Sequence, residues 1–133
     1  MKMKHLKGIA LAAAAVVGLA ACGGSSSSTD TTAAAGGDYS NLKVAVVYIG
    51  VPGDAGYTYQ HDQGIAALEA ELGITVTRLE NIPEGAESAA TFDQLAAEGY
   101  NLIFGTSFGY MDPMLEVSAK YPDVCFSHAT GYK

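Results

Sequence analysis

Strand-forming residues are densest in the run Lys43-Val44-Ala45-Val46-Val47-Tyr48-Ile49-Gly50. Its apolar, mostly β-branched side chains do not alternate with polar ones, which is typical of a strand buried on both faces of a parallel sheet. A glycine-rich turn follows, and apolar residues then recur at helical spacing from Ile65 to Leu72 before a stop at Gly73. We therefore expect a buried strand followed by a helix over residues 59–72.

The alternation of strand and helix continues toward the C-terminus. Further strands are expected over residues 74–79, 101–104 and 124–126, with one helix from Pro83 to a stop at Gly99 and a shorter one from Asp112-Pro113 that ends before Pro122. Phe92, Leu95 and Ala96 are expected to face inward from the longer of these helices. Short connections between alternating elements are typical of βαβ units, so we expect an α/β fold, with a parallel sheet and helices on both faces.

The last expected strand is followed only by residues 127–133, with no helix to cover it. We therefore expect the chain to be the first half of a longer fold whose second part is absent. A complete small α/β domain is the alternative, because the roughly 90 residues from Asn41 onward suffice for one domain.

The N-terminus has the order of a bacterial lipoprotein signal. Lys2, Lys4 and Lys7 precede an apolar stretch from Gly8 to Ala21, which is too short to span a bilayer and is followed directly by Cys22. Cleavage before this cysteine would leave an acylated N-terminus, and several acyl chains anchor a protein stably to a membrane. A plain signal peptide with a cysteine there by chance is the alternative.

A tether is expected between this signal and the folded part. Residues 23–37 are Ser, Thr, Ala and Gly with one acidic residue, a composition that cannot bury a core. We therefore expect a signal peptide over residues 1–21, a lipidated cysteine with a flexible linker over 22–40, and an α/β lobe over 41–133. The lobe is expected outside the cytoplasm, in the periplasm or on the outer face of the plasma membrane.

Charge and cysteine content limit the possible functions. The expected signal holds three of the seven Lys and Arg residues and none of the fourteen Asp and Glu residues, so the rest of the chain is strongly acidic. Nucleic-acid binding needs a basic surface and is therefore not expected. The only cysteines are Cys22 and Cys125, so acylation of the first leaves no disulfide. Cys125 lies in an apolar run, and we expect it to be a buried, inert thiol.

Unusual residues gather in three loops that follow expected strands, over residues 50–58, 105–112 and 127–133. Ligands of open parallel sheets bind beyond the carboxyl ends of the strands, so these loops are expected to form the site. Aromatic rings and hydrogen-bond-accepting carboxylates suit a flat heterocycle that carries N–H and O–H groups. The side chains concerned are those of Asp54, Tyr57, Tyr59, Phe108, Tyr110, Asp112, His128 and Tyr132.

The same loops lack the patterns of common catalytic and cofactor sites. In the first loop the glycines are three apart and no lysine follows, unlike a dinucleotide fingerprint or a P-loop. His61, Asp62 and His128 do not have a metal-ligand spacing, and no Ser-His-Asp pattern can be placed. We therefore expect no cofactor, no metal and no catalytic residue. An enzyme on a Rossmann-like sheet is the alternative, because a fold alone does not exclude one.

At these loops the sequence resembles the basic membrane protein (BMP) family, substrate-binding lipoproteins of ABC transporters, several of which bind purine nucleosides or bases. The matching stretches are GDAGYTYQHDQG over residues 53–64, LIFGTSFGYMDP over 102–113 and FSHATGYK over 126–133. The resemblance extends from Leu42 onward. It implies a type I periplasmic-binding-protein fold, in which the ligand lies between two hinged lobes. Because family members are longer, it also implies that only the N-terminal lobe is present here.

The resemblance implies ligand contacts in two loops. In the first, the family's aspartate and the aromatic residue three positions later match Asp54 and Tyr57. Tyrosine replaces the more usual Phe or Trp, a change that preserves stacking. Tyr132 and Lys133 match the edge of the cleft. The implied ligand-binding residues are Asp54, Tyr57, Thr58, Ser107, Phe108 and Asp112.

The function implied by the resemblance is binding without catalysis. We expect an extracytoplasmic lipoprotein that delivers a small ligand, most simply a purine nucleoside or purine base, to the permease of an ABC transporter. A ligand-sensing lobe of a signalling receptor is the alternative and would use the same site chemistry. One lobe supplies only one wall of the site, so it is expected to bind weakly by itself.

Overall fold

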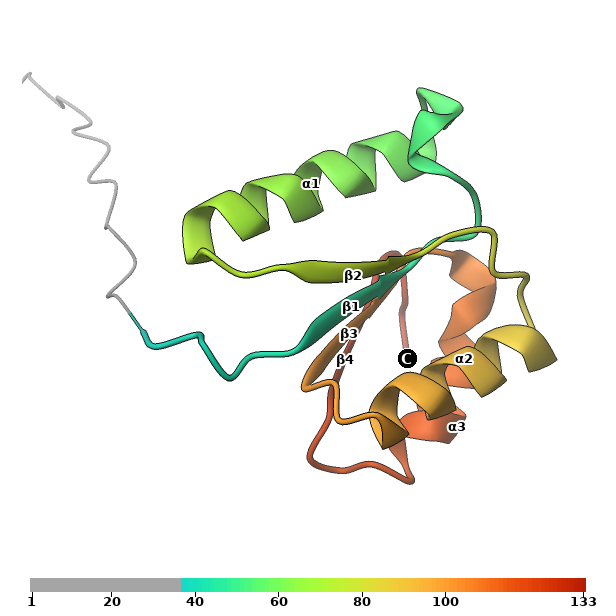
Figure 1. Ribbon diagram of the computed structural model, residues 1–133. Coiled ribbons are helices and arrows are strands. Elements are labelled where there is room, and N and C mark those ends of the chain that lie inside the picture. Colours follow the sequence, from blue (N-terminus) through green and yellow to red (C-terminus); the bar gives the residue numbers. More distant parts are fainter. Residues whose placement is uncertain (1–36) are drawn as a thin grey trace, which may run out of the picture. The chain divides into compact units, whose positions relative to one another are not determined.

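The computed structural model describes residues 37–133, and the expected signal peptide, Cys22 and most of the tether lie outside the described residues. Four strands alternate with three α-helices and two short 3-10 helices (Figure 1). No helix in the described part has both the length and the apolar character needed to cross a membrane. In chain order the elements are β1 (Val44–Val47), η1 (Pro52–Asp54), α1 (Tyr57–Leu72), β2 (Val76–Leu79), α2 (Ala86–Ala97), β3 (Leu102–Gly105), η2 (Phe108–Tyr110), α3 (Met111–Ser118) and β4 (Cys125–His128).

The four strands form one parallel sheet in the order β2-β1-β3-β4, which confirms the predicted sheet. Val47, the last residue of β1, lies level with Leu79 of β2 on one side and Gly105 of β3 on the other. The chain therefore moves from β1 to one edge through α1, and then returns to the other side of β1. The carboxyl ends of β1 and β3 are neighbours at this reversal of strand order.

Helices cover both faces of the sheet, as predicted, with α1 on one face and α2 and α3 on the other (Figure 1). Successive side chains of a strand point to opposite faces. Val44, Val46 and Tyr48 accordingly pack with Ile65 of α1, while Ala45 and Val47 belong to the core that contains the residues of α2 and α3. The three predicted inward residues of α2, Phe92, Leu95 and Ala96, are buried in this second core.

Three helix starts differ from the sequence predictions. α1 begins at Tyr57, two residues early, because Asp54 caps its first turn. α2 begins at Ala86 instead of Pro83, because Gly85 has φ +90° and ψ −134°, a conformation that only glycine adopts readily and that ends any helix approaching it. α3 follows η2 directly, so Asp112 lies within its first turn and is not its N-cap.

The prediction of a buried thiol at Cys125 is wrong, because this side chain is exposed. β4 is an edge strand, and Cys125 lies level with Leu102 of β3, on the α1 side of the sheet. Within residues 37–133, α1 is the only helix on that face, and it packs on the strands farther from this edge. The apolar run around Cys125 thus predicted β4 correctly. It did not indicate that the α1 side of this edge strand would be left uncovered.

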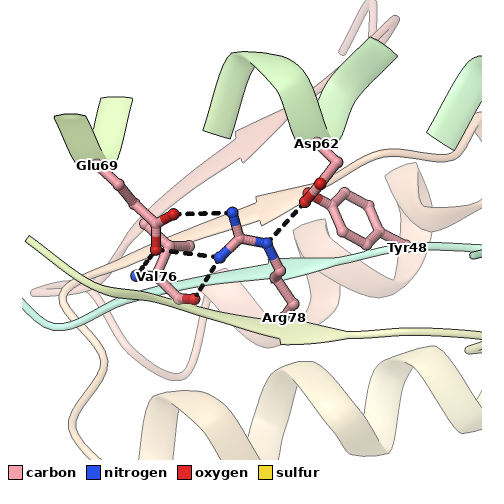
Figure 2. Close-up of polar contacts among 5 residues, drawn as sticks. All are labelled: Tyr48, Asp62, Glu69, Val76 and Arg78. Carbon is pink, nitrogen blue, oxygen red and sulfur yellow. Dashed lines mark hydrogen bonds and ion pairs between the residues drawn. The ribbon is translucent and has the colours of Figure 1, made fainter. Parts of the chain in front are cut away.

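α1 is attached to β2 through the guanidinium group of Arg78 (Figure 2). This group donates from Nε to Asp62 Oδ1 at 2.6 Å and from Nη1 and Nη2 to the two carboxylate oxygens of Glu69, at 3.0 and 2.9 Å. The Tyr48 hydroxyl donates to the same Asp62 oxygen, and the Val76 amide donates to Glu69. Two turns of α1 are therefore held over the sheet by one side chain of β2.

Replacement of Arg78 by methionine is expected to lower the free energy of unfolding by about 1–3 kcal/mol. The reason is that the half-buried Glu69 carboxylate loses a bidentate ion pair and the half-buried Asp62 carboxylate loses a single one. Chemical denaturation at pH 7 measures this loss. The matched control is Lys120→Met, because the exposed Lys120 pairs with Asp93 at 3.4 Å, and an exposed pair is worth no more than about 1 kcal/mol. Equal losses in the two variants would contradict a special role for Arg78.

The same variant is expected to change the acid sensitivity of the fold. Hydrogen bonds from Arg78 and from the Val76 amide lower the pKa of Glu69 from 4.5 to about 2. A lowered pKa stabilises the fold above pH 4.5, and this contribution is lost as the pH falls toward 2, because the unfolded state then binds the extra proton. The difference in stability between wild type and Arg78→Met should therefore shrink as denaturation is repeated from pH 5 down to pH 2.

Candidate functional site

The loops that follow β1, β3 and β4 lie side by side at one end of the sheet. Both the amide and the hydroxyl of Thr106 donate to the carbonyl oxygen of Val47, each at 3.1 Å, and these bonds join the first two loops. The Ala129 amide donates to the carbonyl oxygen of Gly105 at 3.0 Å and joins the third. The strand order reverses between β1 and β3, which is the point where open α/β sheets bind ligands.

Asp54 has a structural role at the start of α1. Its Oδ1 accepts hydrogen bonds from the amides of Gly56 at 2.8 Å and Tyr59 at 3.0 Å, and its Oδ2 accepts one from the amide of Thr58 at 2.9 Å. These bonds, that of Gly56 first, lower the pKa of Asp54 from 3.8 to about 2. The carboxylate is exposed and ionised, and it has acceptor capacity beyond these three bonds.

The two residues after Gly56 differ in exposure. Tyr57, the first residue of α1, is 46% exposed, and its ring meets that of His61 edge-on with centroids 4.5 Å apart. Thr58 is only 2% exposed, and its Oγ1 is 3.0 Å from the position that a Cβ on Gly50 would take. Thr58 therefore packs beneath the loop against Gly50, while the Tyr57 side chain remains largely exposed.

The loop after β3 is organised by Glu84, a residue that the sequence analysis did not select. Glu84 Oε1 accepts hydrogen bonds from the Ser107 hydroxyl at 2.6 Å and from the Gly109 amide at 2.9 Å. Phe108, between these two donors, is 59% exposed. Ser107 is thus brought to the site but is buried and points to Glu84, while Phe108 points outward.

The third loop folds back onto the second. Tyr132 lies beside Phe108, with ring centroids 6.2 Å apart and planes tilted by 34°. Lys133 forms an ion pair with Asp112, one of the predicted acceptors. Nearby, both ring nitrogens of His128 are buried without a hydrogen-bond partner among the described residues.

The six predicted ligand-binding residues all lie in the two neighbouring loops at this end of the sheet, but they are not equally accessible. Four present exposed side chains, namely Asp54, Tyr57, Phe108 and Asp112, and two are buried, namely Thr58 and Ser107. None of the six lines the hollow of about 120 Å³ between α1 and the ends of β3 and β4. The four exposed residues therefore form an open wall and not an enclosed pocket.

The cavity between α3 and β4 and the two histidines of the smaller hollow are not part of this wall. A cavity of about 300 Å³ lies between α3 and β4, but none of the six predicted residues lines it. His61 and His128 both line the smaller hollow, yet within residues 37–133 no group of three His, Cys, Asp or Glu side chains is placed to hold a metal ion.

Comparison with known proteins agrees with the observed fold. The sequence model of the Bmp family, described as PnrA-like substrate-binding proteins of ABC transporters, matches residues 41–133. The chain belongs to this family. The resemblance noted in the sequence is therefore confirmed, and the family is described by binding and not by catalysis, in agreement with the prediction of a non-enzyme.

Individual relatives match this chain over similar lengths. A purine-binding protein of Brucella abortus is 54% identical over 94 residues, and a putative ABC transporter glucose-binding protein of Haloferax volcanii is 39% identical over 92 residues. Each match covers 69% of this chain, but only 27% and 24% of the relative, so the chain spans about a quarter of the length of these proteins. A solved ABC transporter solute-binding protein from Conexibacter woesei has a TM-score of 0.63 at 27% identity, over 68% of this chain and 30% of its own.

Proposed function

We propose that this Bmp-family chain is the ligand-binding N-terminal lobe of an extracytoplasmic receptor that delivers a purine nucleoside or purine base to an ABC transporter permease. Tyr57 and Phe108 stack on the heterocycle, and Asp54 and Asp112 accept hydrogen bonds from its N–H and O–H groups. Thr58 and Ser107 act from beneath, by holding the loops that carry these groups. Closure of a second lobe over the ligand is the event that the permease detects.

The observation that carries this proposal is the pair of exposed aromatic rings at the reversal of strand order. Tyr57, at the start of α1, and Phe108, at the start of η2, are 46% and 59% exposed, although the backbone beside each is held by side-chain hydrogen bonds. Large exposed aromatic side chains that follow two neighbouring strands support a binding surface at this end of the sheet. An ionised Asp54 close to Tyr57 adds an acceptor for ligand donors, which suits a neutral purine and disfavours a phosphate. The similarity to the purine-binding protein of Brucella supports the same ligand class.

A sugar is the second candidate ligand, because the Haloferax relative is named as a glucose-binding protein. Aromatic faces and carboxylates also suit sugars, whose C–H faces stack on rings and whose hydroxyls donate to carboxylates. Purines and sugars differ in how they contact an aromatic ring. A purine stacks face to face through its π-system, and a sugar does not.

The ligand class is tested by titrating the isotope-labelled chain with adenosine, inosine, guanosine, hypoxanthine and glucose while its amide NMR spectrum is recorded. We expect purines to shift the amides of residues 50–59 and 105–112, with dissociation constants weaker than about 100 μM, because one wall cannot bury most of a ligand. Shifts with glucose alone would keep the site and change the ligand. Shifts with none of the five, even at millimolar concentration, would contradict the proposed site.

We also propose that acylation of Cys22 holds the protein at the membrane surface, with residues 23–40 as the tether. The basic and apolar segments before this cysteine support the proposal. Mass spectrometry of the protein from its native membrane should show an N-terminus at Cys22 that carries acyl chains. An unmodified N-terminus at another residue would contradict it.

A further inference from the structure

We propose that Glu84 is a positioning residue of the ligand site, and that the connection between β2 and α2 (residues 80–85) braces both ligand-binding loops. This inference rests on the proposed function and deepens it. The Glu84 side chain does not itself contact the ligand. Its role is to fix the backbone on both sides of Phe108, so that the exposed ring is presented at a constant position.

One arm of the brace reaches the loop after β3. A single oxygen of Glu84 accepts from Ser107 Oγ and from the Gly109 amide, at 2.6 and 2.9 Å, so it bonds the residues on either side of Phe108. A second tie runs parallel to it, because the buried Tyr110 hydroxyl donates to the Ile82 carbonyl oxygen. An exposed ring at the end of a free loop would lose conformational freedom on binding, and a loop that is held in advance avoids this cost.

The other arm reaches the loop after β1. The Asn81 amide donates to the Gly50 carbonyl oxygen at 3.1 Å, and the Ile82 amide donates to that of Tyr48 at 3.0 Å. Gly50 opens the loop that leads to Asp54 and Tyr57. The segment 80–85 therefore contacts both loops, although none of its own residues was predicted to bind the ligand.

Gly109 shows how closely this brace is fitted. A Cβ built on Gly109 would lie 2.2 Å from Glu84 Cδ and 2.4 Å from Oε2. The clash is with the end of a flexible side chain, so Gly109→Ala should push the carboxylate aside without unfolding the lobe. This substitution disrupts the contact between Glu84 and Gly109 by changing Gly109 instead of Glu84. It therefore tests the contact even if the Glu84 variants do not fold.

The test compares amide hydrogen exchange in the full chain with Glu84→Ala, Glu84→Gln and Gly109→Ala. Loss of the acceptor in Glu84→Ala leaves the Gly109 amide without its hydrogen bond, so exchange at Gly109 should accelerate by about tenfold or more. Glu84→Gln keeps an acceptor oxygen and should retain most of the protection. Core amides such as Ile103 should exchange at unchanged rates, which a general loss of stability would not allow.

Ligand shifts in the same variants connect the brace to binding. Adenosine shifts at residues 107–110 should weaken in Glu84→Ala and Gly109→Ala and persist in Glu84→Gln. The matched control is Glu80→Ala, because Glu80 is exposed in the same connection and makes no side-chain hydrogen bond within residues 37–133. Unchanged exchange at Gly109 in Glu84→Ala, or full adenosine shifts despite faster exchange, would overturn the inference. Absence of adenosine shifts in the wild type would overturn the proposed function instead. The exchange rates at Gly109 would then still test whether Glu84 holds the loop after β3.

Discussion

Tyr57→Ala and Phe108→Ala are each expected to weaken purine binding by about five- to 150-fold in a two-lobe protein that contains this lobe. Stacking of a base on an aromatic side chain is worth about 1–3 kcal/mol, which corresponds to about five- to 150-fold in affinity. Such a protein can be made by replacing the matching 94 residues of the Brucella purine-binding protein with those of this chain, because the two are 54% identical there. Isothermal titration with adenosine and guanosine measures the loss.

Tyr59→Ala is the matched control for Tyr57→Ala. Tyr59 is another exposed tyrosine of the first turn of α1, 39% exposed, and it is not among the proposed ligand contacts. The control should change the affinity less than about twofold, because surface substitutions away from a site have small effects. Equal losses at Tyr57 and Tyr59 would indicate damage to the α1 terminus, and unchanged affinity in Tyr57→Ala would remove this residue from the site.

Phe92→Ala is expected to have the largest effect on stability, about 3–5 kcal/mol. Phe92 is fully buried in the core between the sheet and α2, where its ring meets the Tyr110 ring edge-on with centroids 5.4 Å apart. Truncation removes the transfer free energy of the ring and leaves a cavity. A small domain has a total stability of only about 5–15 kcal/mol, so the variant should be largely unfolded or have a much lower melting temperature.

Phe108→Ala is the control for this second prediction, because it is the same substitution at a 59% exposed position. Thermal and urea unfolding should place it within about 0.5 kcal/mol of the wild type. The two phenylalanines thus separate packing from binding: Phe92→Ala should lose the fold, and Phe108→Ala should keep the fold and lose the ligand. A large loss of stability in Phe108→Ala would contradict the open wall described above.

The sequence predicted the sheet well, because the signal for a buried parallel strand is local and strong. The unbroken apolar run at Val44–Val47 and the glycine stops after α1 and α2 indicated the order of elements that is observed. Details that depend on coverage by other elements were less predictable. The exposure of Cys125 follows from the position of β4 at the sheet edge, and no residue near Cys125 signals that position.

The candidate site was predictable in position but not in its internal support. Parallel topology alone brings the loops after β1 and β3 to the same end of the sheet, so the residues predicted from them lie in neighbouring loops. Glu84 is not among the predicted ligand contacts, because the sequence predicts a helix from Pro83 that contains it. The residue that could have indicated its position is Gly85, because a glycine directly before α2 ends the helix there. Glu84 then lies in the connection beyond the carboxyl end of β2. The burial of Thr58 and Ser107 had no local signal, since both are small polar residues in glycine-rich loops.

This lobe is proposed to supply one wall of a purine site, and purine binding by the chimera of this lobe with the Brucella protein is the decisive measurement. The chimera and the parent protein are titrated in parallel with adenosine and guanosine. We predict that the chimera unfolds cooperatively, binds a purine within about tenfold of the parent affinity and does not bind glucose. A chimera that unfolds cooperatively but binds no purine would show that the proposed wall does not belong to a purine site.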